Sequence, residues 1–255
     1  MNPPILVTGG TGTLGRLVTP LLRDTGRPVR VLSRRGGRSV PGIAHVRADL
    51  LTGEGVERAV RGVDTVLHLA GGQQGDDTLA RTLVDAARQA DVRHLVFVSV
   101  VGADRVPLAW LRTKLHAEEA ISGSGLPWTI LRAAQLHDLV LTMAQKLTAL
   151  PVVPLPGLRL QSVDGREVAD RLAELTLGTP AGLVPDIVGP QVHTTGELIR
   201  GYLRASGKRR LTLPVRLPGK AGRAYRDGAN LTLRGATVGT RTWEAFLAER
   251  VVAAR

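Results

Sequence analysis

The chain has no cysteine, and aromatic residues make up only 3% of its 255 residues. Without cysteine there can be no disulfide framework, no thiolate metal site and no cysteine nucleophile. The scarcity of aromatic rings leaves little for nucleic-acid bases to stack on. We also expect no metal site, because no H-x-x-x-H or H-x-H spacing occurs among the six histidines, which stand at 45, 68, 94, 116, 137 and 193.

Long hydrophobic runs are also missing. No stretch approaches the roughly 18 apolar residues that a membrane helix needs, so we expect no membrane partner. The chain begins with a strand-like run, PPILVTGG, and no basic segment precedes a long apolar one. We therefore expect no signal peptide and a cytoplasmic protein. Hydrophobic residues still make up 43% of the chain, enough for a substantial core in an α/β protein of this length.

The charge is one-sided, with 34 Lys and Arg against 22 Asp and Glu and a net charge of +12. Such a balance can indicate nucleic-acid binding. Only four basic residues are lysines, and the basic residues are scattered apart from short clusters at 34–35 and 208–210. A lysine-poor, arginine-rich composition is typical of GC-rich coding sequence, and an anionic cofactor accounts for further positive charge. Because a basic stripe is missing, we expect no nucleic-acid partner.

The first 135 residues alternate apolar, strand-like runs with amphipathic, helix-like ones. Strands that alternate with helices form a parallel sheet that is covered on both faces. The sequence therefore predicts an α/β fold with a Rossmann-type, doubly wound parallel sheet over residues 1–135. Its strands are predicted at 5–8, 29–33, 44–47, 65–69, 95–99 and 128–131, and its helices at 14–25, 55–61, 78–90 and 110–123.

After residue 135 proline and glycine become frequent, as in LPVVPLPGL and LPVRLPGKAGR. Helices are predicted at 165–177 and 195–205, the second with Thr194 or Thr195 as its cap ahead of Glu197. A last amphipathic helix is predicted in TWEAFLAER. We expect residues 136–255 to form a small C-terminal part that packs on the core and shapes a substrate pocket, within one globular unit.

The glycine-rich segment ILVTGGTGTLGR follows a predicted strand and opens a predicted helix, with Gly9, Gly12 and Gly15 at G-x-x-G-x-x-G spacing. Glycine lets the backbone turn tightly and approach a pyrophosphate, and the helix start offers unpaired N–H groups. Threonine hydroxyls in the loop can add donors. The sequence therefore predicts a dinucleotide site with loop contacts from Gly9, Thr11, Gly12, Thr13, Leu14 and Gly15.

The next strand indicates which dinucleotide is bound. An acidic residue about 20 positions downstream would bind the ribose 2′-hydroxyl of NAD. The segment VRVLSRRGGR instead places Ser33, Arg34 and Arg35 there. Two guanidinium groups and a hydroxyl suit a 2′-phosphate, which arginine binds in a bidentate fashion. We therefore predict NADP(H) as the cofactor.

Several motifs occur in a fixed order: TGGTGTLGR, VRVLSRR, VRADL, VLHLAGG, FVSVVGAD, W-x-x-x-K and WTILRAAQLHDLV. Together they resemble the atypical short-chain dehydrogenase/reductases, and more narrowly the NmrA-like NAD(P)H-binding proteins. SVDGREVADRLAELTLG, VGPQVHTTGELIRGYL and TWEAFLAE extend the resemblance over the whole chain. It implies an NADP(H)-dependent oxidoreductase with a small-molecule substrate. The oligomeric state stays open, a homodimer included.

The resemblance also implies roles for single residues around the adenosine. Asp49 and Leu50 would flank the adenine, although an aspartate here could equally cap a turn. The adenosine ribose would lie beside Leu69, Ala70 and Gly71.

Around the nicotinamide, the resemblance gives Ser99 the catalytic serine position and Lys114 the lysine position at the ribose. Ser99 could instead satisfy a backbone group, and Lys114 could be a solvated helix charge. The nicotinamide would lie near Ala133, Ala134 and Gln135, where the family often has a proline.

The tyrosine that usually stands four residues before the lysine is replaced by Trp110, whose indole N–H can only donate. Three alternatives remain. Lys114 or His137 could donate the proton instead. The substrate could be a quinone or an activated alkene that takes its proton from water. The protein could also bind NADP(H) without turnover and act as a redox sensor through a protein partner. We favour hydride transfer to a small, largely apolar carbonyl, quinone or alkene.

Overall fold

The computed structural model describes residues 3–72 and 75–252, in which the chain forms two compact units. Unit 1 contains the residues up to 99 together with 109–131 and 168–184. Unit 2 contains 100–108, 132–167 and the residues from 185 onwards. The sequence predicted one boundary after residue 135, whereas the chain passes between the two units several times. After one such passage, β9 (Gly182–Leu183) lies in unit 1, where it pairs with β6 (Trp128–Ala133).

Unit 1 is built on a sheet with strand order β3-β2-β1-β4-β5-β6. β1 pairs in parallel with β2 and β4, β2 pairs in parallel with β3, and β4 pairs in parallel with β5. This is the strand order of doubly wound dinucleotide-binding folds, and the predicted Rossmann-type fold is confirmed. The strands are β1 (Ile5–Thr8), β2 (Val29–Ser33), β3 (Ile43–Arg47), β4 (Thr65–His68), β5 (His94–Val100) and β6 (Trp128–Ala133).

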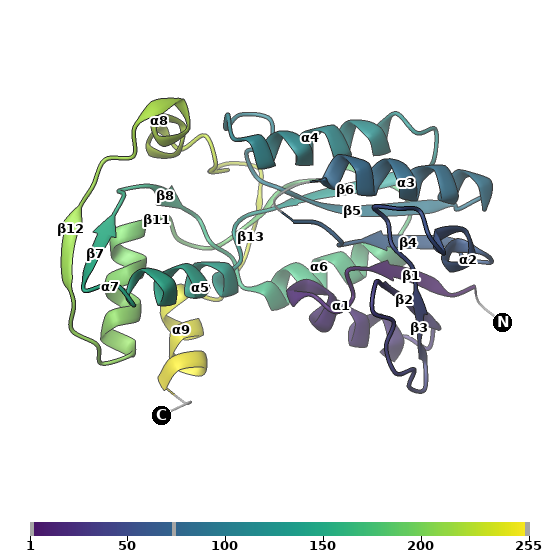
Figure 1. Ribbon diagram of the computed structural model, residues 1–255, viewed down its shortest axis with the longest axis horizontal. Helices are drawn as coiled ribbons and strands as arrows, with labels where there is room; N and C mark the ends of the chain where they lie inside the picture. The colour runs from purple at the N-terminus through teal and green to yellow at the C-terminus, as the bar shows by residue number, and fades with distance from the viewer. Residues whose placement is uncertain (1–2, 73–74, 253–255) are drawn as a thin grey trace. The chain divides into compact units, whose positions relative to one another are not determined.

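Helices cover both faces of this sheet. Figure 1 shows α3 and α4 side by side on one face and α1 on the other. All residues of β1 and β4 are buried, as their apolar sequences predicted. The helices are α1 (Thr13–Asp24), α2 (Val56–Val60), α3 (Asp76–Gln89), α4 (Ala109–Ser122) and α6 (Gly165–Leu177).

The order of the strands reverses between β1 and β4. The chain leaves β1 for one side of the sheet and leaves β4 for the other, so a crevice opens beyond the carboxyl ends of these two strands. The loop after β1 is the glycine-rich segment, and the loop after β4 begins at Leu69. The fold thus places the two predicted cofactor loops opposite each other.

Unit 2 consists of short elements. Thr194 caps α7, because its hydroxyl accepts from the N–H of Glu197 at 3.2 Å and its own N–H donates to the Glu197 carboxylate at 2.7 Å. β7 pairs in parallel with β12, and β8 pairs antiparallel with β11. The elements are α5 (His137–Leu147), β7 (Val152–Leu155), β8 (Arg159–Leu160), β10 (Ile187–Val188), β11 (His193–Thr194), α7 (Thr195–Ala205), β12 (Leu211–Pro214), α8 (Gly219–Asp227), β13 (Thr237–Val238), α9 (Trp243–Leu247) and a π-helical turn (Ala248–Val252).

Two kinds of feature are absent from the part of the chain that the structure describes. No helix there combines the length and the apolar character that are needed to cross a membrane. No three His, Cys, Asp or Glu side chains there come together in a way that could hold a metal ion.

Three histidines are buried in the cores of the two units, namely His68, His94 and His137. His68 shares a hydrogen bond with the Thr8 hydroxyl at 2.7 Å, and His94 shares one with the Thr129 hydroxyl at 2.8 Å. Burial lowers the pKa of all three rings, and in His68, where the charge of Lys114 adds to the effect, the pKa falls to about 3. All three rings are therefore neutral in the folded protein near neutral pH.

These lowered pKa values predict acid sensitivity. Unfolded histidine binds a proton below its ordinary pKa of 6.5, whereas folded His68 stays neutral down to about 3. The stability that this histidine contributes is therefore present above pH 6.5 and is lost as the pH falls from 6.5 towards 3, by roughly 1.4 kcal/mol for each pH unit. Denaturant unfolding across this range should show a shallower slope for His68→Asn than for wild type. His116→Gln is the control, and an equal slope in wild type and His68→Asn would contradict the assignment.

Candidate active site

The glycine-rich loop places backbone atoms where side chains would not fit. Gly9 has a φ of +69°, and a Cβ on it would lie 2.6 Å from the Ala70 nitrogen. A Cβ on Gly15 would lie 2.3 Å from the Gly9 carbonyl oxygen. Gly12 donates its N–H to that same oxygen at 2.9 Å and is the N-cap of α1. The loop can therefore hold this shape only with glycine at Gly9 and Gly15.

A cavity of about 470 Å³ opens between this loop and the ends of the neighbouring strands. The size falls within the range of small-molecule sites. Of the predicted cofactor residues in unit 1, the cavity brings together Gly9, Thr11, Gly12, Ser33, Arg34, Asp49, Leu50, Leu69, Ala70 and Gly71. Those that do not line it are Thr13, Leu14, Gly15, Arg35, Ser99 and Lys114.

The start of α1 fits a bound phosphate. The first turn of an α-helix has backbone N–H groups without intrahelical partners, and its dipole favours a negative charge. Here the N-cap is Gly12, which has no side chain to occupy those groups, and the first turn has no acidic residue. Arg16 donates from Nε to the Thr11 carbonyl at 2.9 Å, which holds the loop on the helix.

A wider hollow of about 660 Å³ lies at the opposite, amino ends of the strands, beside Pro4, Pro28 and Ile43. It has neither a glycine-rich loop nor a helix start beside it. Ligands of open α/β sheets bind at the carboxyl ends of the strands, so we assign the cofactor to the smaller cavity.

The residues predicted to bind the ribose end of the cofactor lie at the ends of β2 and β3. Ser33 donates its hydroxyl to the Gly36 carbonyl at 2.6 Å. Asp49 accepts from the Leu51 N–H at 2.9 Å, so it caps a turn and also lines the cavity. Arg34 and Arg35 are exposed, and within 3–72 and 75–252 neither forms an ion pair. Their guanidinium groups are therefore available to an anion.

Lys114 is buried, with 9% of its surface exposed. Its Nζ lies 3.2 Å from the carboxylate of Asp76, which is only 1% exposed. Asp76 is the first residue of α3 and accepts from the Gly72 N–H at 2.8 Å. Lys114 Nζ also lies 5.1 Å from the centre of the Phe97 ring. The lysine is thus a fixed, paired cation and not a solvated helix charge.

The Lys114–Asp76 pair lies directly behind the cavity wall. A Cβ on Gly71, which lines the cavity, would be 2.8 Å from Lys114 Nζ and 2.9 Å from the Asp76 carboxylate. The Phe97 ring that Lys114 contacts also stacks on the His68 ring, with ring centres 5.3 Å apart. Sequence reasoning missed both Asp76 and His68. An aspartate near a helix start usually indicates only a cap, and a lone histidine in a strand indicates only core.

Ser99 and Trp110 were expected at the reaction centre. Ser99 is 1% exposed near the end of β5, and among the described residues its hydroxyl has no hydrogen-bond partner. Trp110 stands one turn before Lys114 on α4, so the two side chains share a helix face. Trp110 is partly buried, and its carbonyl accepts from the Thr113 hydroxyl at 2.8 Å.

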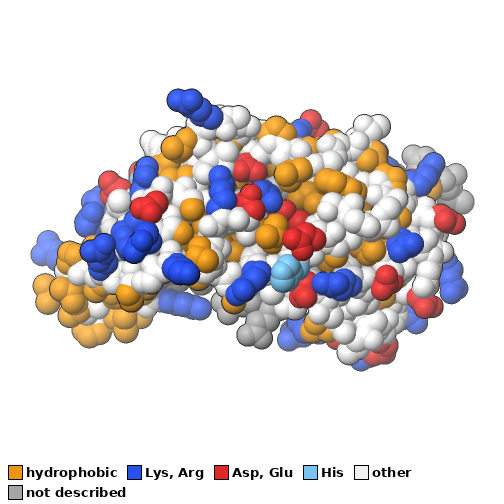
Figure 2. Space-filling model, turned by 90° about the horizontal axis from the view of Figure 1, so that it is seen from above, with side chains coloured by type: hydrophobic (Ala, Val, Ile, Leu, Met, Phe, Trp, Pro, Cys, Tyr) orange, Lys and Arg blue, Asp and Glu red, His pale blue; other side chains and the backbone are white. Residues whose placement is uncertain are grey.

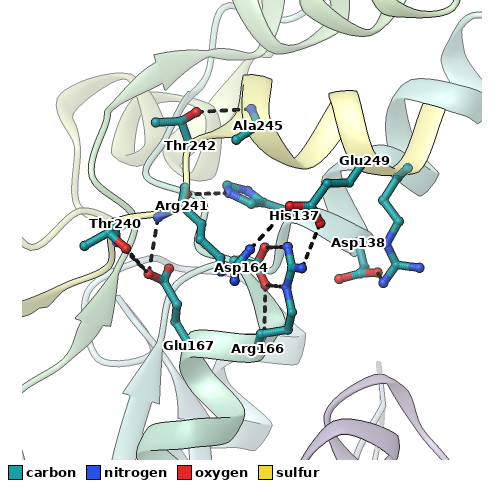
Figure 3. A network of polar contacts seen from close by, with 11 residues as sticks. His137, Asp138, Asp164, Arg166, Glu167, Thr240, Arg241, Thr242, Ala245 and Glu249 are labelled. Carbon is teal, nitrogen blue, oxygen red and sulfur yellow. Dashed lines mark hydrogen bonds and ion pairs between the residues drawn. The ribbon is translucent and has the colours of Figure 1, made fainter. Parts of the chain in front are cut away.

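His137 lies in unit 2, inside the network that Figure 3 shows. Its Nδ1 lies 3.1 Å from the Ser162 hydroxyl, and its Nε2 lies 3.2 Å from the Arg241 carbonyl. The ring is 1% exposed and packs against Trp243 and Phe246. Because both nitrogens are engaged and burial lowers its pKa, the surroundings of His137 favour a structural role over proton donation.

The same network ties the C-terminal segment to the rest of unit 2. Arg166 forms a bidentate pair with Asp164 and reaches the Glu249 carboxylate at 2.7 Å. Glu167 accepts from the N–H and the hydroxyl of Thr240. The three predicted nicotinamide residues also belong to unit 2, with Ala133 and Ala134 buried and Gln135 partly buried.

Comparison with known proteins points to the same class of cofactor. A family profile described as NAD(P)H-binding matches residues 9–175. The chain is 32% identical over 212 residues to the (4-alkanoyl-5-oxo-2,5-dihydrofuran-3-yl)methyl phosphate reductase of Streptomyces griseus, covering 80% of this chain and 74% of the relative. It is 26% identical over 212 residues to the NAD(P)H azoreductase of Xenophilus azovorans, with the same shares covered.

Among solved structures, the NADPH complex of the NADPH-dependent quinone oxidoreductase from Escherichia coli is similar, with a TM-score of 0.79 and 20% identity over 96% of this chain and 99% of that one. This likeness supports the fold. The family match covers more than half of the chain and includes the glycine-rich loop, so NAD(P)H is confirmed as the class of cofactor. The chain belongs to the NAD(P)H-binding family, within the atypical short-chain dehydrogenase/reductases that its ordered motifs resemble.

Proposed function

We propose that the protein is an NADPH-dependent reductase of small, apolar, conjugated acceptors. The observation that carries this proposal is the Lys114–Asp76 pair, which fixes a buried cation at 3.2 Å from its partner behind the cavity wall at Gly71. Trp110, which stands where a tyrosine would donate a proton, offers only an indole N–H. The site therefore has a cation but no phenolic acid.

Such a site suits a substrate that needs no proton from a side chain. Bound NADPH supplies a hydride. When a quinone or an enone accepts it, negative charge spreads over a conjugated system that water can protonate. Lys114, which lies behind the cavity wall, would stabilise this charge through its electric field. Removal of a preorganised donor in direct contact typically costs about 10²–10³ in kcat, which sets the upper limit for Lys114. Asp76 would be a positioning residue that holds the lysine.

The names of the relatives support the same class of substrate. They include an azoreductase, a quinone oxidoreductase and, among solved structures, a triphenylmethane reductase from Citrobacter. Azo compounds, quinones and triphenylmethane dyes all present a conjugated, electron-poor acceptor. A small, largely apolar carbonyl, quinone or alkene is therefore the substrate that we propose for this chain.

For the cofactor, we propose a preference for NADPH over NADH. Arg34 lines the cavity and Arg35 is exposed next to it, in the position that an acidic residue would take in an NAD-specific protein. Charge-assisted hydrogen bonds from arginine to a phosphate are among the stronger polar contacts in proteins. The hydroxyl of Ser33 lines the same end of the cavity.

A second candidate function is a redox sensor that binds NADP(H) without turnover and acts through a protein partner. Trp110 favours it, because a sensor has no use for a proton donor. The two functions differ in one observable property. An enzyme oxidises NADPH when an acceptor is added, whereas a sensor binds NADPH and leaves it unchanged.

The cofactor preference predicts the behaviour of Arg34→Ala combined with Arg35→Ala. Loss of the phosphate contacts should weaken NADPH binding by roughly 10- to 100-fold, at about 1.5–3 kcal/mol for hydrogen bonds to a charged group, and leave NADH binding nearly unchanged. Fluorescence titration of both cofactors measures this ratio. Arg38→Ala, an exposed arginine close to the same loop, is the matched control. An unchanged NADPH-to-NADH ratio in the double variant would show that the specificity argument is wrong.

The role of the Lys114–Asp76 pair predicts a pattern of rates in a four-member cycle. We expect wild type to oxidise NADPH, followed at its nicotinamide absorbance, when quinones and enones are supplied. Lys114→Met should lower kcat by about 10²-fold. Asp76→Asn should lower kcat by about tenfold, because this change removes the partner that positions Lys114 but keeps the lysine itself. The double variant should be no slower than Lys114→Met, since a positioning residue cannot act without the group that it positions.

Two outcomes would contradict this account. Losses that multiply in the double variant would mean that Asp76 acts independently of Lys114. Tight NADPH binding in wild type with no oxidation by any acceptor would instead favour the sensor. Gly15→Ala serves as the negative control in both cases, because its Cβ would lie 2.3 Å from the Gly9 carbonyl and disrupt the loop.

A further inference from the structure

A two-stranded sheet in unit 2 has an uncovered apolar face. β12 pairs in parallel with β7, and Leu211 lies opposite Val152. Leu211 is 74% exposed and Val152 is 44% exposed. The alternate residues of β7, Val153 and Leu155, are buried on the other side. One side of this sheet thus packs in the core of unit 2, and the other side is exposed to solvent.

The apolar character extends beyond the paired residues. Along the chain, exposed hydrophobic residues recur at every second position through β12 and past its end, as they do when they share one side of an extended segment. All residues from 207 to 220 are exposed. We name this surface the β7–β12 face and define it by Leu150, Val152, Leu211, Leu213, Val215 and Leu217.

The β7–β12 face lies in segments of the chain whose charged residues are all basic. Residues 198–226 contain nine Lys and Arg and no Asp or Glu, and residues 139–163 contain two and none. In the sequence only residues 208–210 stood out as a cluster, but in the structure five basic residues fall within the exposed segment 207–220. They are Lys208, Arg209, Arg210, Arg216 and Lys220.

Basic and apolar groups meet in one hollow at the edge of this face. The hollow has a volume of about 480 Å³ and is lined by Ala149, Pro151, Arg209, Arg210 and Leu211. Arg210 donates to the Thr148 carbonyl at 3.2 Å, which fixes β12 beside the start of β7. Figure 2 shows hydrophobic side chains gathered at the β12 end of unit 2 with Lys and Arg side chains next to them.

We propose that the β7–β12 face docks on an anionic phospholipid surface. Exposed aliphatic side chains surrounded by Lys and Arg are the combination that binds at a membrane interface, because the apolar groups enter the boundary of the acyl chains and the cations pair with the headgroups. The hollow beside Arg209 would take a phosphate. This is a peripheral contact, which needs no membrane-spanning segment, and it is independent of the proposed reductase activity.

Other occupants fit the face less well. A second copy of the chain would bring two exclusively basic segments together, and like charges that meet across an interface are repelled. Nucleic acid would make no use of the exposed aliphatic side chains for binding. Its bases would also have no tyrosine of unit 2 to stack on, because Tyr202 and Tyr225 are buried.

Co-sedimentation with vesicles tests the proposal. Wild type should bind vesicles of phosphatidylcholine with one third phosphatidylglycerol, bind pure phosphatidylcholine far more weakly, and lose binding as salt rises. Arg209→Gln with Arg216→Gln should lower the partition coefficient roughly 25-fold, at about fivefold per charge removed. Leu211→Ser with Leu213→Ser should also weaken binding, and since both side chains are exposed, thermal melts should show that the variant stays folded.

Matched controls make each result decisive. Arg81→Gln with Arg88→Gln removes two exposed charges from α3 in unit 1 and should leave vesicle binding within about twofold. No binding by wild type, or equal loss in the control, would overturn the proposal. So would tighter binding to duplex DNA or to an acidic polypeptide than to the vesicles, or a wild-type dimer that Leu211→Ser with Leu213→Ser dissociates in sedimentation equilibrium.

Discussion

A buried lysine needs a partner, and in this protein the partner of Lys114 is Asp76. A charge that leaves water without compensation costs several kcal/mol, so the position of Asp76 constrains everything around it. α3 has to begin where the carboxylate can reach both Lys114 and the Gly72 N–H. A side chain on Gly71 would displace the ends of Lys114 and Asp76, because a Cβ there would lie 2.8 Å from Lys114 Nζ and 2.9 Å from the Asp76 carboxylate. The ion pair thus lies behind one residue of the cavity wall, Gly71, and does not itself line the cavity.

The positive charge of Lys114 also affects the residues around the pair. His68 lies close enough to Lys114 for the cation to help keep its ring neutral, with a pKa of about 3. Phe97 contacts both: its ring stacks on His68, and it faces the Lys114 ammonium group, a contact that favours the cation. With the indole of Trp110 on the same helix face, this region provides positive charge and no acidic hydroxyl. For that reason we propose a substrate that can take its proton from water.

The sequence allowed much of unit 1 to be predicted, because its signals are local. Alternating apolar strands and amphipathic helices fix the order of the elements, and the glycine spacing after β1 identifies the phosphate loop. Motif and position predicted the loop residues and Arg34, and the resemblance added Asp49, Leu50 and residues 69–71. All of these except Thr13, Leu14 and Gly15 line the cavity. Ser99 and Lys114, also named from the resemblance, do not line it. Asp76 could not be found in this way, because its pairing with Lys114 joins two helices that are far apart in the sequence.

Unit 2 was harder to predict. Its strands are two to four residues long, too short for an alternating pattern, and α8 was missed. His137 was a candidate proton donor because it follows β6, but its contacts with Ser162 and Arg241 depend on tertiary packing that no local signal reveals. The exposure of β12 was equally hidden, since LTLPV resembles a buried strand in sequence.

The most direct test of the central claim is deuterium transfer from NADPH labelled at nicotinamide C4 to an enone, whose β-carbon would retain the label. Mass spectrometry of the product distinguishes hydride transfer from simple binding. The account predicts labelled product from wild type and a much lower yield from Lys114→Met under the same conditions. Tight NADPH binding without labelled product would contradict the reductase, and equal yields from both proteins would contradict the role given to Lys114.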